Sequence, residues 1–243
     1  MKKIFTCLMI FTTLTIFAQE ETAEDKFSVG LSLNHDVFFG LNPMMTFSYD
    51  VSEKGALTAY GIQWGAGTGS AWGNWTEFGL GYNFSAGDFD INPQLGFTFG
   101  SLLSSGAAQE GIIGDGIVPN LTVNYGSEKF EGQLYFGYYA ALSDNTSAGQ
   151  NTTNYIHYWL NFGYKAASFF SFGGHLEQLT FTGGSVNGGG DLDSNDVYIG
   201  VGPYVQFTKG NAGLRLSFGA NIADEDDGAI ADDFYKLSFF MNL

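Results

Sequence analysis

Apolar and polar residues alternate along most of the chain with a period of two. In the segment 88–100, apolar residues such as Ile91 and Leu95 occupy the odd positions, and polar residues such as Asn92 and Gln94 occupy the even positions. In a β-strand, this period places the two sets of side chains on opposite faces. The chain is therefore predicted to be built from strands that have one apolar face and one polar face.

Twelve segments carry this pattern. We predict strands at 26–36, 43–51, 55–65, 74–84, 88–100, 117–126, 129–142, 153–165, 168–182, 196–208, 211–222 and 233–243. Most of them are long enough to cross a bilayer at a tilt, which takes about 9–11 residues. Short connections alternate with the longer segments 37–42, 66–73, 101–116, 143–152, 183–195 and 223–232. Short periplasmic turns, long outer loops and an even number of strands are typical of a transmembrane barrel.

The apolar face distinguishes a membrane barrel from a soluble one. In the register that we predict, this face carries no charged residue, and its polar exceptions are Thr58, Thr76 and Gln178. A lysine or arginine facing lipid at mid-bilayer costs about 2–4 kcal/mol, so a lipid-facing wall excludes charge. A soluble barrel such as a lipocalin, the alternative, would carry its charges outside. We predict an all-β, transmembrane, antiparallel up-and-down barrel of about twelve strands.

Two features depart from a regular strand pattern. Pro93, Pro119 and Pro203 lie within predicted strands, where proline lacks a donor, and we expect bulges there. The ninth strand changes phase near Gln178, because apolar residues move from the even Leu176 to odd positions. A bulge or an early end of the strand would explain this change.

The N-terminus has the form of a secretory signal. Lys2 and Lys3 precede an apolar stretch that ends at Ala18, where the chain turns acidic. Cleavage there would divide the chain into a signal peptide, 1–18, and an outer-membrane barrel, 19–243. The single cysteine, Cys7, lies inside the signal, so the barrel has no thiol and no disulfide.

The amino-acid composition limits the classes of molecule that the protein can be expected to bind. The formal net charge is −16, and charged residues make up 14% of the chain, against about 25% in an average soluble domain. An acidic chain lacks the basic footprint that nucleic acid requires, so no nucleic-acid partner is expected. The expected partners are outer-membrane lipid, the barrel-insertion machinery and a small polar solute. No cofactor is expected beyond a loop-bound divalent cation.

Four segments resemble uncharacterised outer-membrane barrels of Bacteroidota. They are Phe17-Ala18-Gln19, residues 60–65, residues 79–84 and the C-terminal residues 235–243, which resemble an assembly signal. Barrels of this kind usually end on an aromatic residue, whereas this chain ends on Leu243. The resemblance covers the barrel architecture and implies recognition by the insertion machinery, and it supplies no catalytic residues.

The polar face would line the lumen. Its amides and aromatic rings suit a neutral hydroxylated solute such as a sugar or a nucleoside. The candidate ligand-binding residues are Trp159, Tyr135, Tyr139, Tyr198, Tyr204, Asn92, Gln94, Gln133 and Arg215. A lumen filled by its own side chains is the alternative, because twelve strands fall between filled eight-stranded barrels and open channels of 16–18 strands. The two alternatives are a small pore and a closed structural or surface-interaction barrel.

Charged residues provide two further hypotheses. Arg215 could pair inside the lumen with an acidic or histidine side chain, and the candidates are Glu77, Glu131, His175 and Glu177. In the loops, carboxylates could bind a divalent cation, and the candidates are Asp191, Asp193, Asp226 and Asp227.

An outer-membrane hydrolase is a third, less favoured function. A barrel phospholipase needs a serine beside a histidine, and none of the three histidines offers that pair. A barrel protease of the omptin kind could use His35 and Asp36 with acidic residues from 226–227 and 232–233. We predict that the chain is not an enzyme. The glycine-rich segment 65–70 is predicted to be a loop, followed by Trp72 and Trp75 in the interfacial aromatic belt.

Overall fold

The computed structural model describes residues 26–65, 75–99, 115–142, 151–186, 190–224 and 232–243. The proposed signal peptide therefore lies outside the described residues, as does Trp72. The strands are β1 (Phe27–Asp36), β2 (Gly40–Ser52), β3 (Gly55–Trp64), β4 (Trp75–Ala86), β5 (Phe89–Phe99), β6 (Gly116–Gly126), β7 (Phe130–Ala141), β8 (Asn151–Ala167), β9 (Phe170–Val186), β10 (Asp191–Leu192), β11 (Asn195–Lys209), β12 (Ala212–Asn221) and β13 (Asp233–Asn242). Among the described residues, no helix is long and apolar enough to cross a membrane.

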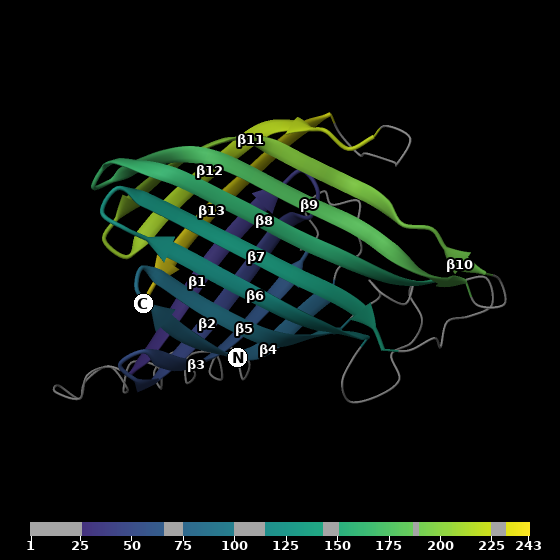
Figure 1. Cartoon of the computed structure of the whole chain (residues 1–243), viewed down its shortest axis with the longest axis horizontal. Helices are drawn as coiled ribbons and strands as arrows, with labels where there is room; N and C mark the ends of the chain where they lie inside the picture. The colour runs from purple at the N-terminus through teal and green to yellow at the C-terminus, as the bar shows by residue number, and fades with distance from the viewer. Residues whose placement is uncertain (1–25, 66–74, 100–114, 143–150, 187–189, 225–231) are drawn as a thin grey trace, which may run out of the picture.

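The strands close into an antiparallel barrel (Figure 1). Each long strand pairs with its neighbours in sequence, and β13 pairs with β1, where Lys236 lies opposite Asp36. The two-residue β10 precedes β11 in sequence and pairs with the last residues of β9, next to the part of β9 that pairs with β11. It therefore extends β11 along the same edge of β9 and does not add a thirteenth strand to the wall. The twelve predicted strands are thereby confirmed in the described residues. We call the end with short connections and the C-terminus the turn end, and the opposite end the loop end.

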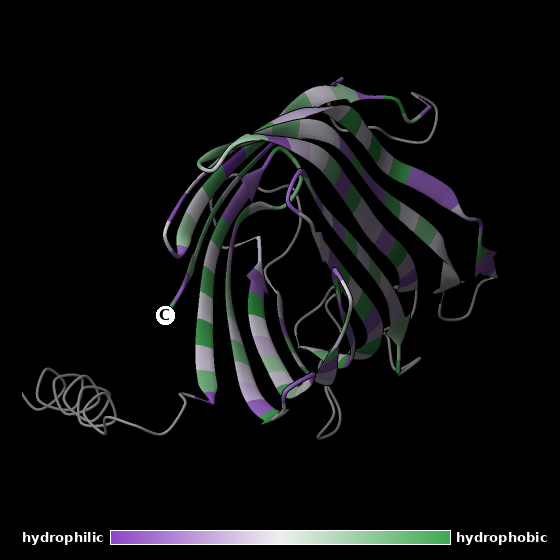
Figure 2. Cartoon of the chain, turned by 60° about the vertical axis from the view of Figure 1, so that its left-hand side comes forward, coloured by the Kyte–Doolittle hydropathy of each residue, from purple (hydrophilic) through white to green (hydrophobic). Residues whose placement is uncertain are grey.

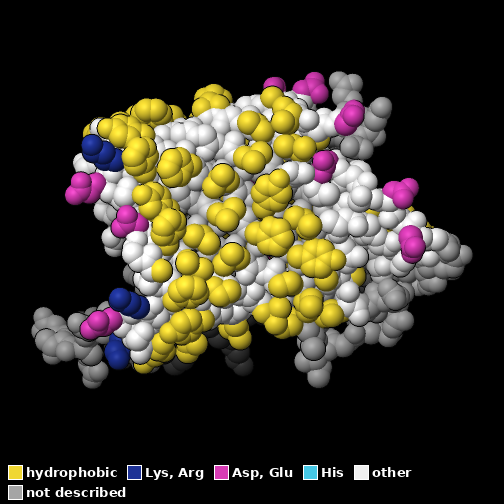
Figure 3. Space-filling view, in the orientation of Figure 1, with side chains coloured by type: hydrophobic (Ala, Val, Ile, Leu, Met, Phe, Trp, Pro, Cys, Tyr) yellow, Lys and Arg dark blue, Asp and Glu magenta, His cyan; other side chains and the backbone are white. Residues whose placement is uncertain are grey.

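The outer wall is apolar. Along the strands, hydrophilic and hydrophobic residues alternate (Figure 2), and the outward set includes Leu80, which is 68% exposed, and Phe78, which is 55% exposed. Figure 3 shows apolar side chains across the middle of the wall, with charged side chains at its two ends. Large apolar side chains exposed over a whole wall are typical of a surface that lipid covers.

The register of β3 differs from the prediction. Tyr60, Ile62 and Trp64 are less than a tenth exposed, whereas Leu57 is 55% exposed. Thr58 therefore points into the lumen, where its hydroxyl donates to Asn92 Oδ1 at 2.9 Å. The predicted outward position of Thr58 is wrong, because both faces of β3 carry apolar residues and the more apolar face packs inside the barrel.

Trp75 also lies in the lumen instead of the interfacial belt. It is 4% exposed and stacks on Trp64 at a centroid distance of 6.0 Å. Its neighbour Thr76 points outward, as predicted from the alternation along β4. A tryptophan at the end of a strand is compatible both with the interfacial aromatic belt and with an aromatic cluster in the lumen, so the sequence alone does not distinguish these two positions.

β9 keeps its phase through Gln178. Leu179 is 4% exposed inside the barrel, so the predicted change of phase is wrong. The irregularities in its two ladders lie elsewhere, beyond Phe181 in β9, between Asp196 and Tyr198 in β11 and, at the turn end, between Lys165 and Ala167 in β8. The second one places Asp196 on the outer face, where Oδ1 accepts hydrogen bonds from Gln178 at 2.8 Å and Thr180 at 2.6 Å.

The prolines are accommodated without bulges. Pro93 pairs with Leu121 and Pro203 pairs with Gly174, and the register runs on unchanged in both ladders. The second ladder of each strand, β4–β5 for Pro93 and β11–β12 for Pro203, has unpaired residues at the proline and resumes in the same register beyond it. The missing N–H of each proline therefore coincides with a short gap in one ladder and causes no register shift.

Replacing Leu80 with arginine tests the lipid-facing wall. Leu80 lies in the middle of β4 and pairs with Ala59 and Leu95, so we expect Leu80→Arg to lower the free energy of unfolding in lipid vesicles by about 2–4 kcal/mol. Ile222 is similarly exposed, at 62%, but follows the loop end of β12, where Ile222→Arg should cost about 0–1 kcal/mol. Urea titrations of both variants check this difference. Equal costs would contradict the expected position of Leu80.

Candidate functional site in the lumen

The turn between β1 and β2 folds into the barrel. Phe38 and Phe39, which form this turn, are 5% and 3% exposed. Asp36 Oδ1 accepts hydrogen bonds from both of their backbone N–H groups, at 2.9 Å from Phe38. A carboxylate that bonds the backbone two and three residues ahead stabilises a tight turn. These hydrogen bonds therefore hold the β1–β2 connection, at the loop end, as a compact turn inside the barrel. We call Phe38 and Phe39 in this turn the plug.

The plug completes an aromatic layer across the lumen, which we call the septum and define as Phe39, Trp64, Trp75, His157 and Tyr198. Phe39 lies 4.8 Å from Trp64 and 5.4 Å from His157, measured between ring centroids. Trp64 and His157 are themselves 5.9 Å apart, although β3 and β8 are five strands apart along the wall. These rings therefore bridge nearly opposite sides of the barrel.

Little room remains between the rings. The cavity beside Phe39, Trp64 and His157 measures about 10 Å³, which is no more than the room of one water molecule. A hollow of about 990 Å³ exists, but it is lined mainly by outer-wall residues such as Leu33, Phe78 and Leu80. It therefore lies on the lipid side and is not the lumen. In this conformation the septum rings fill the space between the β1–β2 turn and the inner faces of β3, β4, β8 and β11.

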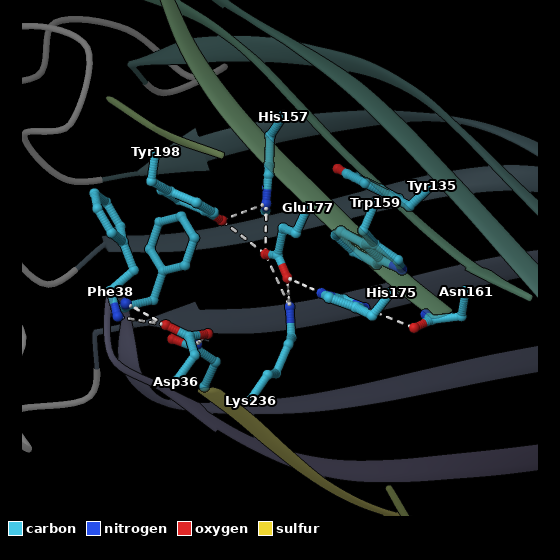
Figure 4. Close-up of polar contacts among 12 residues, drawn as sticks. Asp36, Phe38, Tyr135, His157, Trp159, Asn161, His175, Glu177, Tyr198 and Lys236 are labelled. Atoms are coloured by element: carbon cyan, nitrogen blue, oxygen red, sulfur yellow. Dashed lines mark hydrogen bonds and ion pairs between the residues drawn. The ribbon is translucent and has the colours of Figure 1, made fainter. Parts of the chain in front are cut away.

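A buried charge centre lies beside the septum (Figure 4). Glu177 is 1% exposed, and Lys236 Nζ donates to its two carboxylate oxygens at 2.9 and 2.8 Å. Tyr198 donates to Glu177 Oε1 at 2.7 Å. Nitrogens of His157 and His175 lie 2.9 and 3.3 Å from the carboxylate. A buried carboxylate needs such partners, because its desolvation is otherwise costly.

The charge centre and the plug form one unit. Lys236 lies opposite Asp36 in the β1–β13 ladder, and its Nζ bonds Glu177, so the lysine joins the charge centre to the strand that carries Asp36. The ring of Phe38 lies 4.3 Å from that of Tyr198, which is itself bonded to Glu177. The turn therefore packs directly against the residues that surround the Lys236–Glu177 ion pair.

An aromatic platform lies next to Lys236. Trp159 stacks on Tyr135 at 4.0 Å between centroids, and Lys236 Nζ lies 4.8 Å from the Trp159 ring. Gln133 Oε1 accepts a hydrogen bond from Trp159 Nε1 at 3.2 Å, and the hydroxyls of Tyr135 and Tyr139 are 3.2 Å apart. The structure thus brings together four of the residues that the sequence placed in the lumen.

Arg215 belongs to a separate network. Its Nε donates to Gln206 at 2.7 Å, and Gln206 donates to Glu131 Oε2 at 3.0 Å. The guanidinium also lies 5.1 Å from the ring of Tyr204, whose hydroxyl donates to Glu131 at 3.0 Å. Of the predicted partners of Arg215, Glu131 is reached through Gln206, while Glu177 bonds Lys236 instead. Glu77 bonds Tyr60 and Trp64 on another part of the wall.

The remaining candidates lie apart from these groups. Asn92 and Gln94 bond Thr58 on the inner face of β3 and β5. Asp191 and Asp193 are exposed at the loop end, and Asp226 and Asp227 lie outside the described residues. Within the described residues, no three histidine, cysteine or acidic side chains gather as metal ligands.

The predicted protease pair does not form. His35 stacks on Tyr235 at 5.9 Å on the outer side of the wall, whereas Asp36 is 3% exposed inside and binds the turn. Adjacent residues of a strand point to opposite faces, so His35 and Asp36 cannot act together on one substrate.

Sequence reasoning missed Lys236 and the plug. Lys236 lies in the segment that resembles an assembly signal, and its even position predicts a place on the inward face of β13. Phe38 and Phe39 break the alternation as two adjacent aromatic residues in a connection. Two adjacent aromatic residues outside a strand are therefore the signal that could have identified the plug.

Comparisons with known proteins agree with the fold. A family model described as a family of unknown function (DUF6733) matches residues 1–243. An outer membrane channel from Pseudomonas putida F1 is 13% identical, with a TM-score of 0.55 over 92% of this chain and 100% of that chain. The NanC porin is 9% identical, with a TM-score of 0.52 over 88% and 100% of the two chains. None of the curated proteins matches the sequence.

These identities show a shared barrel fold alone. The resemblance to Bacteroidota barrels stays a prediction, because the comparisons carry no evidence on the source of the chain.

Proposed function

The chain belongs to DUF6733, a family of unknown function, and we propose that it is an outer-membrane channel for small solutes that a septum holds closed in this conformation. One observation carries the proposal: the barrel has a lipid-type outer wall and a polar, aromatic lumen, and a turn of the chain itself closes that lumen. The plug lies between Asp36 and Gly40, the last pair of the β1–β2 ladder, so the proposed opening moves this turn and the side chains that it carries.

The expected solute is neutral and polar, such as a sugar or a nucleoside. Trp159 and Tyr135 offer stacked ring faces, and Gln133 and Asn161 offer amides on neighbouring strands. Sugar rings stack on aromatic faces, while amides exchange hydrogen bonds with hydroxyl groups. This combination supports the platform as the binding site for such a solute.

The proposed location is the outer membrane, reached after removal of the signal peptide and insertion by the barrel-insertion machinery. The turn end would face the periplasm, as short turns do in bacterial barrels. Lys54, Lys129 and Lys209 are near this end, while the segments that join the strands at the loop end are acidic. A loop-bound divalent cation remains part of this proposal.

A closed structural or surface-interaction barrel is the second candidate function. The septum itself favours it, because ring contacts such as that between Trp64 and His157 already cross the lumen without the plug. The two functions differ in one measurable property: a channel conducts when the plug is displaced, and a structural barrel does not.

Phe39→Ala is expected to raise conductance. The variant removes the ring that packs against both Trp64 and His157, so single-channel recordings of the refolded chain, residues 19–243, should show a rise in open probability of about tenfold. Such a rise corresponds to about 1.4 kcal/mol, which lies below the usual cost of removing a buried phenylalanine. Phe89→Ala on the outer wall, where Phe89 is 45% exposed, is the matched control and should leave conductance unchanged. A heat-shifted gel band first verifies folding.

The outcomes separate the two functions. If Phe39→Ala conducts and a sugar or nucleoside blocks its current, loss of that block in the additional variant Trp159→Ala would support the platform. If the folded Phe39→Ala barrel stays silent, the chain is not a channel of this kind and the structural barrel stands.

A further inference from the structure

Glu77 is a second buried carboxylate, and its partners are neutral. It is 1% exposed and accepts hydrogen bonds from Tyr60 Oη and from Trp64 Nε1, the latter at 3.1 Å. Tyr139 is a further hydrogen-bond partner. Among the described residues, no lysine, arginine or histidine nitrogen lies within 4.0 Å of its carboxylate. Glu177, by contrast, has Lys236.

Aromatic rings surround the space beside Glu77. We define the cage as Trp64, Trp75, Tyr139 and Tyr155, all of which line one small cavity. Trp64 and Tyr139 are in the cage and also bond Glu77, so the carboxylate lies directly behind these two side chains. Aromatic faces attract cations through their quadrupole, and desolvated cages of this kind recognise organic ammonium groups.

The occupant of the cage is a side chain of the chain itself. Phe39 lies 4.8 Å from Trp64 and 6.1 Å from Trp75, between centroids, and lines the same cavity. Its ring supplies apolar bulk but no positive charge. In this conformation the Phe39 ring fills the space of the cage, but it brings no positive charge near the Glu77 carboxylate.

The approach to the cage favours cations. The sequence segments that join strands at the loop end contain ten acidic residues and no lysine or arginine. These residues are Glu110, Asp115, Asp144, Asp191, Asp193, Asp224, Glu225, Asp226, Asp227 and Asp232. Figure 3 shows acidic side chains at the loop end, while the visible basic ones lie at the turn end. A mouth of one sign raises the local concentration of the opposite ion.

We propose that the cage and Glu77 form a binding site for an organic ammonium group, which Phe39 occupies when no ligand is bound. The ligand carries alkyl groups against the rings, and its positive charge is attracted by the ring faces and by the Glu77 carboxylate behind Trp64 and Tyr139. A metal ion fits poorly, because hard cations such as calcium take six to eight oxygen ligands and the cage presents mainly ring faces. A compact ammonium group replaces the Phe39 ring in size.

This site adjoins the Trp159 platform where the hydroxyls of Tyr139 and Tyr135 are 3.2 Å apart, and it rests on the proposed function only in taking the plug as movable. Binding can be measured without conduction. The two proposals can therefore be rejected separately. Choline binding without conductance would support the ammonium site and reject the channel. Conductance without choline binding would support the channel and reject the ammonium site.

The probe is choline, compared with 3,3-dimethyl-1-butanol, which has the same shape and no charge. Isothermal titration of the refolded chain in detergent should give binding of choline that is about thirtyfold tighter than binding of the neutral alcohol, since a desolvated cation–π contact contributes about 2 kcal/mol. Tryptophan fluorescence should change on addition of choline, because Trp64 and Trp75 line the cage.

Variants test each part of the site. Glu77→Gln should weaken choline binding about tenfold while leaving the alcohol unaffected, because it removes the charge and keeps the shape. Glu131→Gln is the matched control, since Glu131 is another lumen carboxylate with neutral partners, Ser171, Tyr204 and Gln206, and should not change choline binding. Phe39→Ala should tighten choline binding, because no ring must then be displaced.

Two results would overturn the proposal. One is equal affinity of folded wild type and Phe39→Ala for choline and for the neutral alcohol, including no binding of either. The other is an equal loss of choline binding in Glu77→Gln and Glu131→Gln, which would assign the effect to the overall charge of the lumen.

Discussion

Lys236→Met is expected to lower the free energy of unfolding by about 3–5 kcal/mol, because removing one partner of a buried ion pair leaves the other charge unpaired. Lys236 is 14% exposed and Glu177 only 1%, so solvent cannot replace the ammonium group. The methionine keeps most of the volume of the lysine stem and its place beside Trp159. The loss therefore reports the charge of Lys236 and not a cavity. Urea titration of the refolded chain in lipid vesicles measures it.

Two further variants make the result specific. Lys209→Met removes an exposed lysine near the turn end and should change the stability by less than about 1 kcal/mol. Adding Glu177→Gln to Lys236→Met should recover much of the loss, since the remaining group is then neutral. If the double variant is no more stable than Lys236→Met, the ion pair is not the cause and the charge centre loses its assigned role.

Gly163→Ala is expected to destabilise the barrel by about 1–3 kcal/mol through overpacking. Gly163 lies on the inner face of β8, and a Cβ atom there would lie 2.1 Å from Tyr204 Oη and 2.6 Å from the carbonyl oxygen of Phe172. The carbonyl belongs to the paired strand and cannot yield. Tyr204 is held by Glu131 and by Arg215, so moving its ring disturbs the network on that wall.

Gly174→Ala is the matched control, because Gly174 lies on the neighbouring strand and a Cβ atom there meets nothing within 4 Å. It should change stability by less than about 0.5 kcal/mol. A double variant with Tyr204→Ala should lose less than the sum of the two single losses, since the side chain that clashes is then absent. Additive losses would show that Tyr204 does not limit the space at Gly163.

The barrel itself could be predicted from the sequence because its wall lies between two different media. Lipid removes charge from one face and the lumen accepts polar groups on the other, so the alternation in β5, β11 and β12 is visible residue by residue. Strand ends agreed within a few residues, since polar turns and strand length are local properties. The predicted lumen residues Tyr135, Trp159, Tyr198, Tyr204 and Arg215 all lie on inward faces for this reason.

The alternation failed where both faces of a strand are apolar. In β3, the inward face carries Tyr60, Ile62 and Trp64, which pack against the plug and the opposite wall. In β9, Leu179 joins the same inner cluster while Gln178 bonds Tyr158 on the outside. A lumen with its own apolar layer reverses the rule that apolar residues face lipid, and no local signal marks that layer.

The sequence by itself determined the closed wall, its strand number and the acidic connections of the loop end, since these follow from a period of two, from the connection lengths and from composition. The tertiary structure alone decided how the lumen is filled. Phe39, Trp64 and His157 come from three distant segments, and so do Asp36, Glu177 and Lys236. Which side chains meet across a barrel depends on the shear of its strands and on side-chain packing, and neither is recorded in the pattern of any single strand.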